Sequence, residues 1–376
     1  MEKAIKKYFP VFALPTLVAF TIGFIVPFIM GIYLSFCEFT TVTDAKFVGL
    51  KNYLRVFSDS TFMHALWFTA LFTIVSVLTI NVFAFVIAML LTKGIKGTNF
   101  FRTVFFMPNL IGGIVLGYIW QILLNGILGH FGRTLTYSSS YGFWGLIILM
   151  NWQQVGYMMI IYIAGLQAIP EDMLEAAKID GASSWKTLWN ITIPNIMPSI
   201  TICTFLSLTN GFKLFDQNLA LTGGQPYIIQ SDGSAIKTTE MLALNIYNTF
   251  YGQNANSRGT AQAKAVLFFI LWNAAWVTDR CGEWTAAVDT VTADLDAGGD
   301  GGAALGTLDD LWQDVQGYMH IIVSHEDLDE AEALMAQAKA LSAQGSTEKL
   351  YPVLAQLRHQ FRLIAETQQL SPKNIF

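Results

Sequence analysis

Residues 166–198 read LQAIPEDMLEAAKIDGASSWKTLWNITIPNIMP, and this stretch decides how the rest of the chain is interpreted. Pro170 lies where a helix can begin, because its missing amide hydrogen is not needed in the first turn. Glu171 and Asp172 favour the positive N-terminal end of such a helix. Gly181 suits the left-handed residue that closes a helix. The sequence therefore predicts a short helix between Pro170 and Gly181.

A second helical segment should follow directly. Ser183 or Ser184 can cap its first turn. Pro194 and Pro198 should bend the chain at the end of this segment, because proline interrupts helical hydrogen bonding. On these features alone, an ordinary amphipathic loop and a docking surface for a partner fit about equally well.

The chain is too apolar for an ordinary soluble protein, since 53% of its 376 residues are hydrophobic and only 13% are charged. Its charge is divided unevenly. Residues 1–270 hold 16 Lys and Arg against 11 Asp and Glu, a net charge of +5, whereas residues 271–376 hold 6 against 16, a net charge of −10. This change, together with a shift from Phe, Ile and Leu to Ala, Asp and Gln, predicts a transmembrane domain over 1–280 and an acidic helical domain over 281–376.

A membrane crossing requires about 20 apolar helical residues. Five stretches are long enough, and we expect spans at about 10–36, 65–92, 103–124, 142–167 and 195–215. The first lacks a small-residue cleavage site and should remain as an anchor. A sixth stretch, 265–277, has only 13 residues and is interrupted by Asn273, so the sequence does not show whether this span is complete.

Basic residues indicate the orientation, because cytoplasmic loops next to the spans are enriched in Lys and Arg. Such residues precede span 1 and separate spans 2 from 3 and 4 from 5: Lys3, Lys6, Lys7, Lys93, Lys96, Arg102, Lys178 and Lys186. We expect these segments in the cytoplasm, including the long loop 168–194. The segments 38–63, 125–141 and 220–262 are then expected outside.

The loop closely resembles the signature of ABC importer permeases, E-A-A-x-x-D-G-A followed about nine residues later by I-x-x-P. The L-Q-A-I-P before it is similar to the carbohydrate-uptake branch typified by the maltose and glycerol-3-phosphate permeases. In that family the short helix is the coupling helix, which seats in a cleft of the cytoplasmic ATPase. The resemblance implies this docking role for the matching residues Glu175, Ala176, Ala177, Asp180 and Gly181, and the two alanines would leave a low surface for the partner.

Three further segments resemble the same branch: FVGLKNY at 47–53, RTVFFMP at 102–108 and LTGGQP at 221–226. The last departs from the usual G-G-P because Gln225 intervenes. Together the matches cover roughly residues 8–270. They imply an all-α membrane protein with six transmembrane helices of the type I ABC importer permease kind, followed by a small soluble helical domain.

The sequence has no nucleotide-binding loop, so we expect a transport subunit without its own ATPase site, without catalytic residues and without cofactors, ATP being bound by a partner. The cysteines and histidines have no companions at metal spacing, and no metal site is expected. The resemblance implies a multi-pass protein of the bacterial plasma membrane. Its implied partners are a second homologous permease subunit, a cytoplasmic ABC ATPase dimer, an extracellular or periplasmic solute-binding protein and a sugar-like solute, with no nucleic acid.

Polar side chains within membrane spans are costly and therefore tend to face a cavity or another helix. The resemblance implies sugar contact at or beside Asn109, Gln153, Gln154, Ser207 and Gly211, and the spans also contain Asn151 and Asn210. The alternative is that these groups bond across helices and stabilise the bundle. Lys213 and Asp216, three residues apart, either neutralise each other or, if Lys213 is unpaired, favour an anionic solute. Trp152 could stack on a sugar ring.

The tail shows helical apolar spacing over 307–319, 326–343 and 346–369, and its Gly-rich stretch 297–302 is a linker or turn. Its end at 370–376 resembles membrane-anchored bacterial helical domains that close with N-I-F. The sequence leaves open the solute, the side of the membrane on which the tail lies, and whether the tail belongs naturally to the permease. The competing interpretations are a membrane-anchored sensor or structural protein whose tail is the working domain, and an artefactual fusion of a truncated permease with an unrelated helical domain.

Overall fold

The computed structural model describes residues 14–94, 96–231, 235–252 and 257–368. The chain divides into two compact units, Met1–Lys264 and Ala265–Phe376. This boundary lies before residue 280, the position at which the change in composition predicted it. The basic residues Lys3, Lys6 and Lys7 and the terminal segment 370–376 lie outside the described residues, so the predictions made from them stay predictions.

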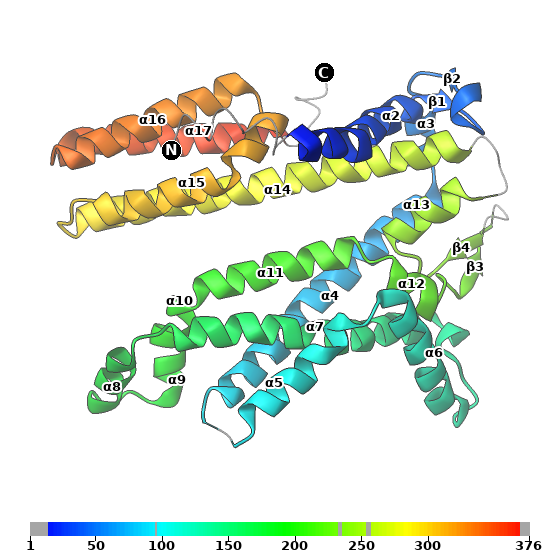
Figure 1. The fold of residues 1–376 in the computed structure, drawn as a ribbon, viewed down its shortest axis with the longest axis horizontal. Coiled ribbons are helices and arrows are strands. Elements are labelled where there is room, and N and C mark those ends of the chain that lie inside the picture. The colour runs from blue at the N-terminus through cyan, green and yellow to red at the C-terminus, as the bar shows by residue number, and fades with distance from the viewer. Residues whose placement is uncertain (1–13, 95, 232–234, 253–256, 369–376) are drawn as a thin grey trace. The chain divides into compact units, whose positions relative to one another are not determined.

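Unit 1 is built from helices with two short hairpins (Figure 1). Its elements are η1 (Thr21–Ile25), α2 (Val26–Ser35), β1 (Cys37–Glu38), η2 (Val42–Asp44), β2 (Lys46–Phe47), α3 (Lys51–Phe57), α4 (Ser60–Leu91), α5 (Thr98–Phe106), η3 (Met107–Leu110), α6 (Gly113–Gly129), η4 (Leu135–Tyr137), α7 (Ser139–Gln167), α8 (Glu171–Ile179), α9 (Ser184–Thr187), η5 (Leu188–Thr192), α10 (Ile193–Asn195), α11 (Met197–Phe212), α12 (Asp216–Leu221), β3 (Tyr227–Ile229), β4 (Ala235–Lys237) and α13 (Leu242–Phe250). Both hairpins are antiparallel, with Cys37 opposite Phe47 and Tyr227 opposite Lys237. α14 (Ser257–Asp296) begins in unit 1 and continues into unit 2.

α4 is the central helix of unit 1. It contains neither Gly nor Pro over 32 residues, and the Asp59 side chain accepts hydrogen bonds from the amides of Thr61 and Phe62 at its start, which satisfies donors that the first turn leaves free. α7 and α11 both pack against it. Its buried face includes a stripe at four-residue spacing, which is one side of a helix: Phe72, Ser76, Ile80, Ala84 and Ala88.

α5 crosses α7 at a point where a side chain does not fit. A Cβ atom added to Gly156 would lie 1.8 Å from the carbonyl oxygen of Phe105. Only glycine therefore allows the backbones of α5 and α7 to approach this closely. The expected cytoplasmic loop between spans 2 and 3 is held to the rest of the unit through this crossing.

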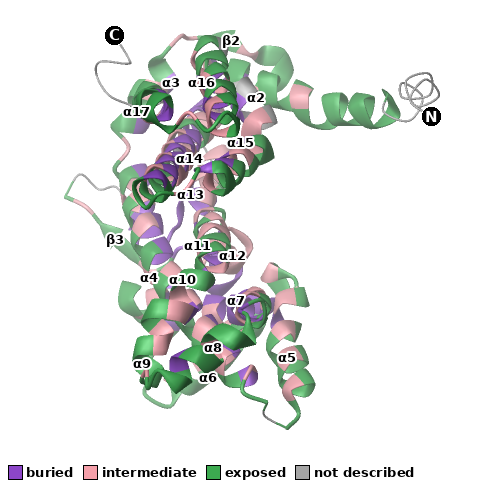
Figure 2. Ribbon diagram, turned by 90° about the vertical axis from the view of Figure 1, so that its left-hand side faces the viewer, coloured by how far each residue is buried: buried purple, intermediate pink, exposed green. Residues whose placement is uncertain are grey.

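Three helices are long and apolar enough to cross a membrane, namely Leu14–Ser35, Ser60–Leu91 and Ser139–Gln167. They confirm the apolar spans expected at 10–36, 65–92 and 142–167 over their described parts. The first is almost wholly exposed, with 6% of its apolar window buried (Figure 2). Such a surface fits contact with lipid rather than with water.

The stretches expected as spans at 103–124 and 195–215 are not single straight helices. Thr98–Leu110 and Gly113–Gly129 meet at 103°, and Ser184–Asn195 and Met197–Phe212 meet at 70°. The first bend follows from Pro108, which lacks an amide donor, and from the extended backbone of Gly112. The second lies between Pro194 and Pro198, where a bend was expected.

The sixth expected stretch, 265–277, lies inside α14. Among the residues that the structure describes, α14 is not one of the helices that meet the length and apolarity needed for a crossing. Lys264 precedes the apolar run, and Asp279 and Arg280 follow it. A sixth span therefore stays a prediction.

The segment FVGLKNY at 47–53 ties the first outer loop together. Asn52 is fully buried, and its Nδ2 donates to the carbonyl oxygens of Ser35 and Cys37, each at 2.9 Å. The hydroxyl of Tyr53 lies 2.6 Å from Ser35 Oγ. This segment thus connects the end of α2 to β1 and α3.

Unit 2 contains the second part of α14 together with α15 (Gly302–Ile322), α16 (His325–Ala343) and α17 (Thr347–Gln368). These helices confirm the three helical segments predicted for the tail. α14 contributes a buried stripe with alternating steps of four and three residues (Figure 2), as in a coiled-coil seam: Val277, Cys281, Trp284, Val288, Val291 and Leu295.

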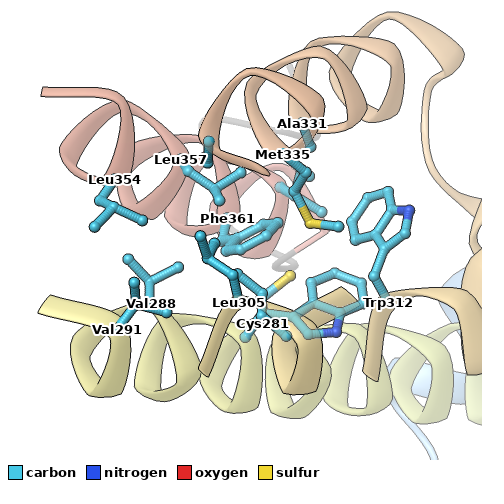
Figure 3. Packing of buried hydrophobic residues seen from close by; sticks show 14 of the residues in the cluster. Cys281, Val288, Val291, Leu305, Trp312, Ala331, Met335, Leu354, Leu357 and Phe361 are labelled. Atoms are coloured by element: carbon cyan, nitrogen blue, oxygen red, sulfur yellow. The ribbon is translucent and has the colours of Figure 1, made fainter. Parts of the chain in front are cut away.

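An aromatic cluster forms the centre of this core. The ring of Trp284 lies 4.7 Å from that of Trp312 and 5.2 Å from that of Phe361, distances at which aromatic pairs attract each other. Figure 3 shows Trp312 and Phe361 among the apolar side chains of α14 to α17. The stretch 297–302 forms the turn between α14 and the start of α15 at Gly302, as predicted. In this turn Asp294 Oδ2 accepts from the amide of Gly301 at 2.9 Å.

Candidate functional site

α8 (Glu171–Ile179) is the short helix predicted from the sequence. Gly181 has φ of +75°, and its amide donates to the carbonyl oxygen of Lys178 at 3.1 Å. The amide of Ala182 donates to the carbonyl oxygen of Ala177 at 2.9 Å. These two bonds form a Schellman closure, which requires the left-handed conformation at Gly181 that other residues adopt at a cost.

The residues matched to the permease signature do not all face outward. Glu175, Ala176 and Asp180 are exposed, whereas Ala177 is only 6% exposed and packs within the loop. The expected low surface is therefore formed by Ala176 and not by both alanines. Beside it Ile179 is 85% exposed, an apolar side chain that sequence reasoning did not single out. Its position in the loop is the only sequence signal that could have found it.

The second helical segment begins where it was expected. Ser183 Oγ accepts from the amide of Lys186 at 3.3 Å and caps α9. A groove of about 380 Å³ lies between α8 and the α9–η5 segment. Trp185 and Trp189 are 67% and 53% exposed, with ring centroids 5.7 Å apart. Exposed tryptophans near the entry of a span are typical of the membrane–water interface.

Gln153 and Gln154 on α7 bond to different neighbours. Gln153 Nε2 donates to the carbonyl oxygen of Ile111 at 3.3 Å, and Gln217 Nε2 donates to Gln153 Oε1 at 2.8 Å. Asn210 Nδ2 donates to Gln154 Oε1 at 3.1 Å. The structure therefore brings Gln154 and Asn210 together and connects Gln153 to α12. Gln217 was missed, although it stands in the polar run Asp216 to Asn218 after an apolar span.

Asn151 and Ser207 face α4 instead. Asn151 Nδ2 donates to Thr79 Oγ1 at 2.9 Å. Ser207 is 2% exposed, donates to the carbonyl oxygen of Cys203 at 2.7 Å and accepts from Asn81 Nδ2 at 3.3 Å. These bonds fit the alternative in which polar groups stabilise the bundle.

Gly211 and Asn109 lie in different surroundings. A Cβ atom at Gly211 would lie 2.8 Å from the side chain of Thr73, so Gly211 is where α11 approaches α4 closely. Asn109 is half-buried in η3, two residues before Ile111 at the bend. The seven residues predicted for the solute path therefore do not form a single cluster within this subunit.

A hollow of about 260 Å³ lies among α7, α11, α12 and the segment that joins α11 to α12. Its lining residues are Met150, Gln154, Asn210, Lys213, Leu214, Phe215, Asp216 and Gln217. Lys213 is exposed, and it makes no ion pair with Asp216 in the part of the chain that the structure describes. The hollow is thus lined by amides, a cation and a carboxylate. Trp152 is 44% exposed and contacts Trp120, with ring centroids 5.5 Å apart.

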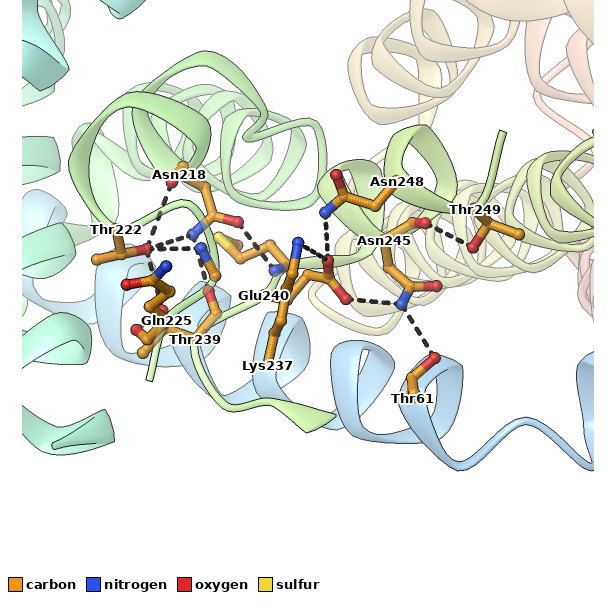
Figure 4. A network of polar contacts seen from close by, with 12 residues as sticks. Thr61, Asn218, Thr222, Gln225, Lys237, Thr239, Glu240, Asn245, Asn248 and Thr249 are labelled. Atoms are coloured by element: carbon orange, nitrogen blue, oxygen red, sulfur yellow. Dashed lines mark hydrogen bonds and ion pairs between the residues drawn. The ribbon is translucent and has the colours of Figure 1, made fainter. Parts of the chain in front are cut away.

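A polar network on α12, β4 and α13 also escaped sequence reasoning (Figure 4). Asn218 is fully buried; its Nδ2 donates to the carbonyl oxygen of Thr239 at 2.8 Å, and its Oδ1 accepts from the amide of Met241 at 3.0 Å. Thr239 Oγ1 donates to the carbonyl oxygen of Gln225 at 2.7 Å. The LTGGQP segment is therefore fixed against the chain that follows β4.

A buried ion pair joins α14 to α4. Lys264 is 1% exposed, and its Nζ lies 2.7 Å from Asp59 Oδ2. Burial alone would raise the pKa of Asp59, but Lys264 and the bonds from Thr61 outweigh it and hold this pKa below its ordinary value. Asp59 is therefore ionised at neutral pH.

Comparison with known proteins gives the family. Residues 60–275 match the family described as "Binding-protein-dependent transport system inner membrane component". The chain is 42% identical over 269 residues to the probable starch degradation products transport system permease protein AmyD of Thermoanaerobacterium thermosulfurigenes, which covers 69% of this chain and 88% of that protein. It is 32% identical over 282 residues to the multiple sugar-binding transport system permease protein MsmF of Streptococcus mutans, covering 72% and 93%.

The fold is also similar to a chain in the crystal structure of a bacterial ABC transporter that imports the acidic polysaccharide alginate. The TM-score is 0.56 at 20% sequence identity, over 70% of this chain and 91% of that one, which supports the fold alone. The family match covers more than half of the chain and ends at residue 275, before the core of unit 2 begins. The chain therefore belongs to the family of inner membrane components of binding-protein-dependent transport systems.

Proposed function

We propose that this chain is the permease subunit of an ATP-driven importer of sugars or sugar-like solutes in the bacterial inner membrane. Relatives named as permeases for starch degradation products and for multiple sugars support this solute class. The observation that carries the proposal is the α8 loop, in which Glu175, Ala176 and Asp180 are presented on a helix closed by Gly181. These features fit a surface for a partner rather than an ordinary connection.

In this function the chain forms part of the solute path and has no ATPase site of its own. ATP would be bound by a cytoplasmic ATPase dimer that receives α8. A second, homologous permease subunit would complete the path, and a solute-binding protein outside the cell would deliver the solute. The candidate solute-path residues do not form a single cluster within this subunit, which supports a path that two permeases share.

The solute contacts are proposed at Gln153, Gln154 and Asn210. Neutral amides donate and accept hydrogen bonds, which suits the hydroxyl groups of a sugar. Three other candidates would act indirectly, by holding α4 against α7 and α11 without contacting the solute: Asn151, Ser207 and Gly211. Asn109 stays a candidate at the bend before α6.

The coupling role of α8 is tested in proteoliposomes that contain the complete importer. Gly181→Val should abolish solute-stimulated ATP hydrolysis, because φ of +75° is strained for a β-branched residue, and Glu175→Lys should do so by reversing the charge at the docking surface. Glu171→Lys, on an exposed first-turn residue outside the signature, is the matched control and should retain most stimulation. Normal coupled turnover in both signature variants would show that α8 is not the coupling helix.

A further inference from the structure

Asn245 lies between two buried charges of opposite sign, Glu240 and Lys264. Figure 4 shows its contact with Glu240. It stands on α13 and is 3% exposed. Its Nδ2 donates to the carboxylate of Glu240 at 2.8 Å, and its Oδ1 accepts from the ammonium of Lys264, also at 2.8 Å. A carboxamide carries a donor and an acceptor on one planar group, so a single side chain bonds to both charges.

Each charge also has a partner of its own. Glu240 is 5% exposed, and its Oε1 lies 3.6 Å from Lys237 Nζ. Lys264 is paired with Asp59 and also donates to Thr249 Oγ1 at 2.8 Å. Buried charges are tolerated only when they are paired and hydrogen-bonded. The polarity of residue 245 is therefore strongly specified.

Contacts continue from this cluster toward the proposed solute path. Glu240 is flanked by Thr239 and Met241, and the backbone of both bonds to Asn218 on α12. The next residue along α12, Gln217, donates to Gln153 Oε1 at 2.8 Å. α12 is thus held on one side by the segment around Glu240 and reaches α7 on the other.

We propose that Asn245 is a positioning residue of the transporter. By bridging Glu240 and Lys264 it holds segment 239–241 in place, and through Asn218 it holds α12, so that Gln217 keeps Gln153 oriented. The inference rests on the proposed function in treating Gln153 as part of the solute path. Asn245 itself does not contact the solute.

The polarity of the bridge can be reversed. Asn245→Asp places a second carboxylate beside Glu240 and removes the donor, so the two groups repel. Adding Glu240→Gln should restore the bridge. The new carboxylate at residue 245 still accepts from Lys264, and the new amide at residue 240 donates to that carboxylate. The double variant also keeps the net charge of the natural pair.

Two further variants make the comparison sharper. Asn245→Ala deletes the bridge but leaves Lys264 paired with Asp59, so this variant is expected to insert even if Asn245→Asp does not. Asn125→Asp on α6 is the control, because Asn125 Oδ1 accepts from the amide of Leu135 at 2.8 Å and aspartate keeps that acceptor.

The first readout is the position of Gln217 relative to Gln153, measured without any solute. Cysteines replace these two residues in the full chain, with the three native cysteines changed to serine, and a short bis-methanethiosulfonate reagent cross-links them in membranes. We expect cross-linking to be at least fivefold slower with Asn245→Asp and at least threefold slower with Asn245→Ala. The cross-linking rate should return to within twofold of the parental rate in the double variant, and it should stay unchanged in Asn125→Asp.

The second readout is uptake of labelled maltotriose by the complete importer in proteoliposomes. Asn245→Asp should raise the half-saturating concentration at least fivefold, and Glu240→Gln should reverse this. The positioning role would be overturned if Asn245→Ala cross-linked at the parental rate. It would also be overturned if the double variant were as impaired in cross-linking and uptake as Asn245→Asp. If the natural importer takes up no sugar, the proposed solute class fails, while the cross-linking rates still decide the role of Asn245.

Discussion

The ion pair between Asp59 and Lys264 gives a prediction whose size follows from burial. Asp59→Asn keeps an oxygen that can cap α4, because Asn and Asp are about equal as N-caps, but it removes the charge that faces Lys264. Lys264 is 1% exposed and would keep only neutral acceptors. Breaking a buried pair in this way costs about 3–5 kcal/mol. Because asparagine keeps an oxygen that can accept from Lys264, the loss of stability in Asp59→Asn should lie at the lower end, about 3 kcal/mol.

The reverse substitution should cost less. In Lys264→Met the Asp59 carboxylate keeps its bonds from Thr61 and Phe62, and 26% of its side chain is exposed to solvent. The expected loss is about 1.5–2 kcal/mol, the lower end of the range for a hydrogen bond to a charged group. The double variant should lose less than the sum of the two, because it leaves no unpaired buried charge.

The measurement is the free energy of unfolding in mixed detergent micelles, followed by the loss of helical signal. Asp44→Asn is the control, since asparagine keeps an oxygen that can accept from the exposed amides of Thr40 and Thr41, and it should change stability by less than about 0.5 kcal/mol. The pKa of Asp59 is below its ordinary value, so its contribution is complete above the ordinary carboxyl range and is lost as the pH falls through the lowered value. A smaller loss for Asp59→Asn than for Lys264→Met, or strict additivity, would refute the reasoning.

Three further predictions concern the solute path and the tail. Replacing both Gln153 and Gln154 by alanine should raise the half-saturating solute concentration without preventing insertion, by about fivefold for each hydrogen bond of about 1 kcal/mol that is lost; unchanged uptake kinetics would assign both residues to helix packing. Deleting residues 282–376 should leave the ATPase bound, because the loop 168–194 lies wholly in unit 1, as co-purification would show. If 265–277 completes a sixth span, the tail lies in the cytoplasm, and protease added outside sealed cells should not cleave at 298–302. Cleavage there would place the tail outside.

Local signals allowed the α8 loop to be predicted almost completely. Gly181 adopts the left-handed conformation, Ser183 caps α9, and a bend lies between Pro194 and Pro198. Each of these features depends on residues within one or two helical turns, and the preferences of Gly, Ser and Pro act at that range. The inward position of Ala177 was missed because it depends on packing against the following segment.

The candidate solute path was less predictable. The sequence marked polar residues in apolar helices, but their spacing could not show which of two neighbouring helices each one faces. Asn151 and Ser207 bond toward α4, whereas Gln154 and Asn210 bond to each other. The sharp bend before α6 was also missed, since Pro108 and Gly112 permit a bend without fixing its angle.

The sequence by itself determined the membrane character, the charge division between the two parts of the chain, the α8 loop and the helices of the tail, because apolar runs, charge and helix ends are encoded over short ranges. Only the tertiary structure showed that Lys264 is buried against Asp59, that Asn245 bridges Glu240 and Lys264, and that Gln217 reaches Gln153. These contacts join residues from separate elements. No periodicity or motif encodes them, since which polar groups meet is settled only when the helices pack and every buried charge must find a partner.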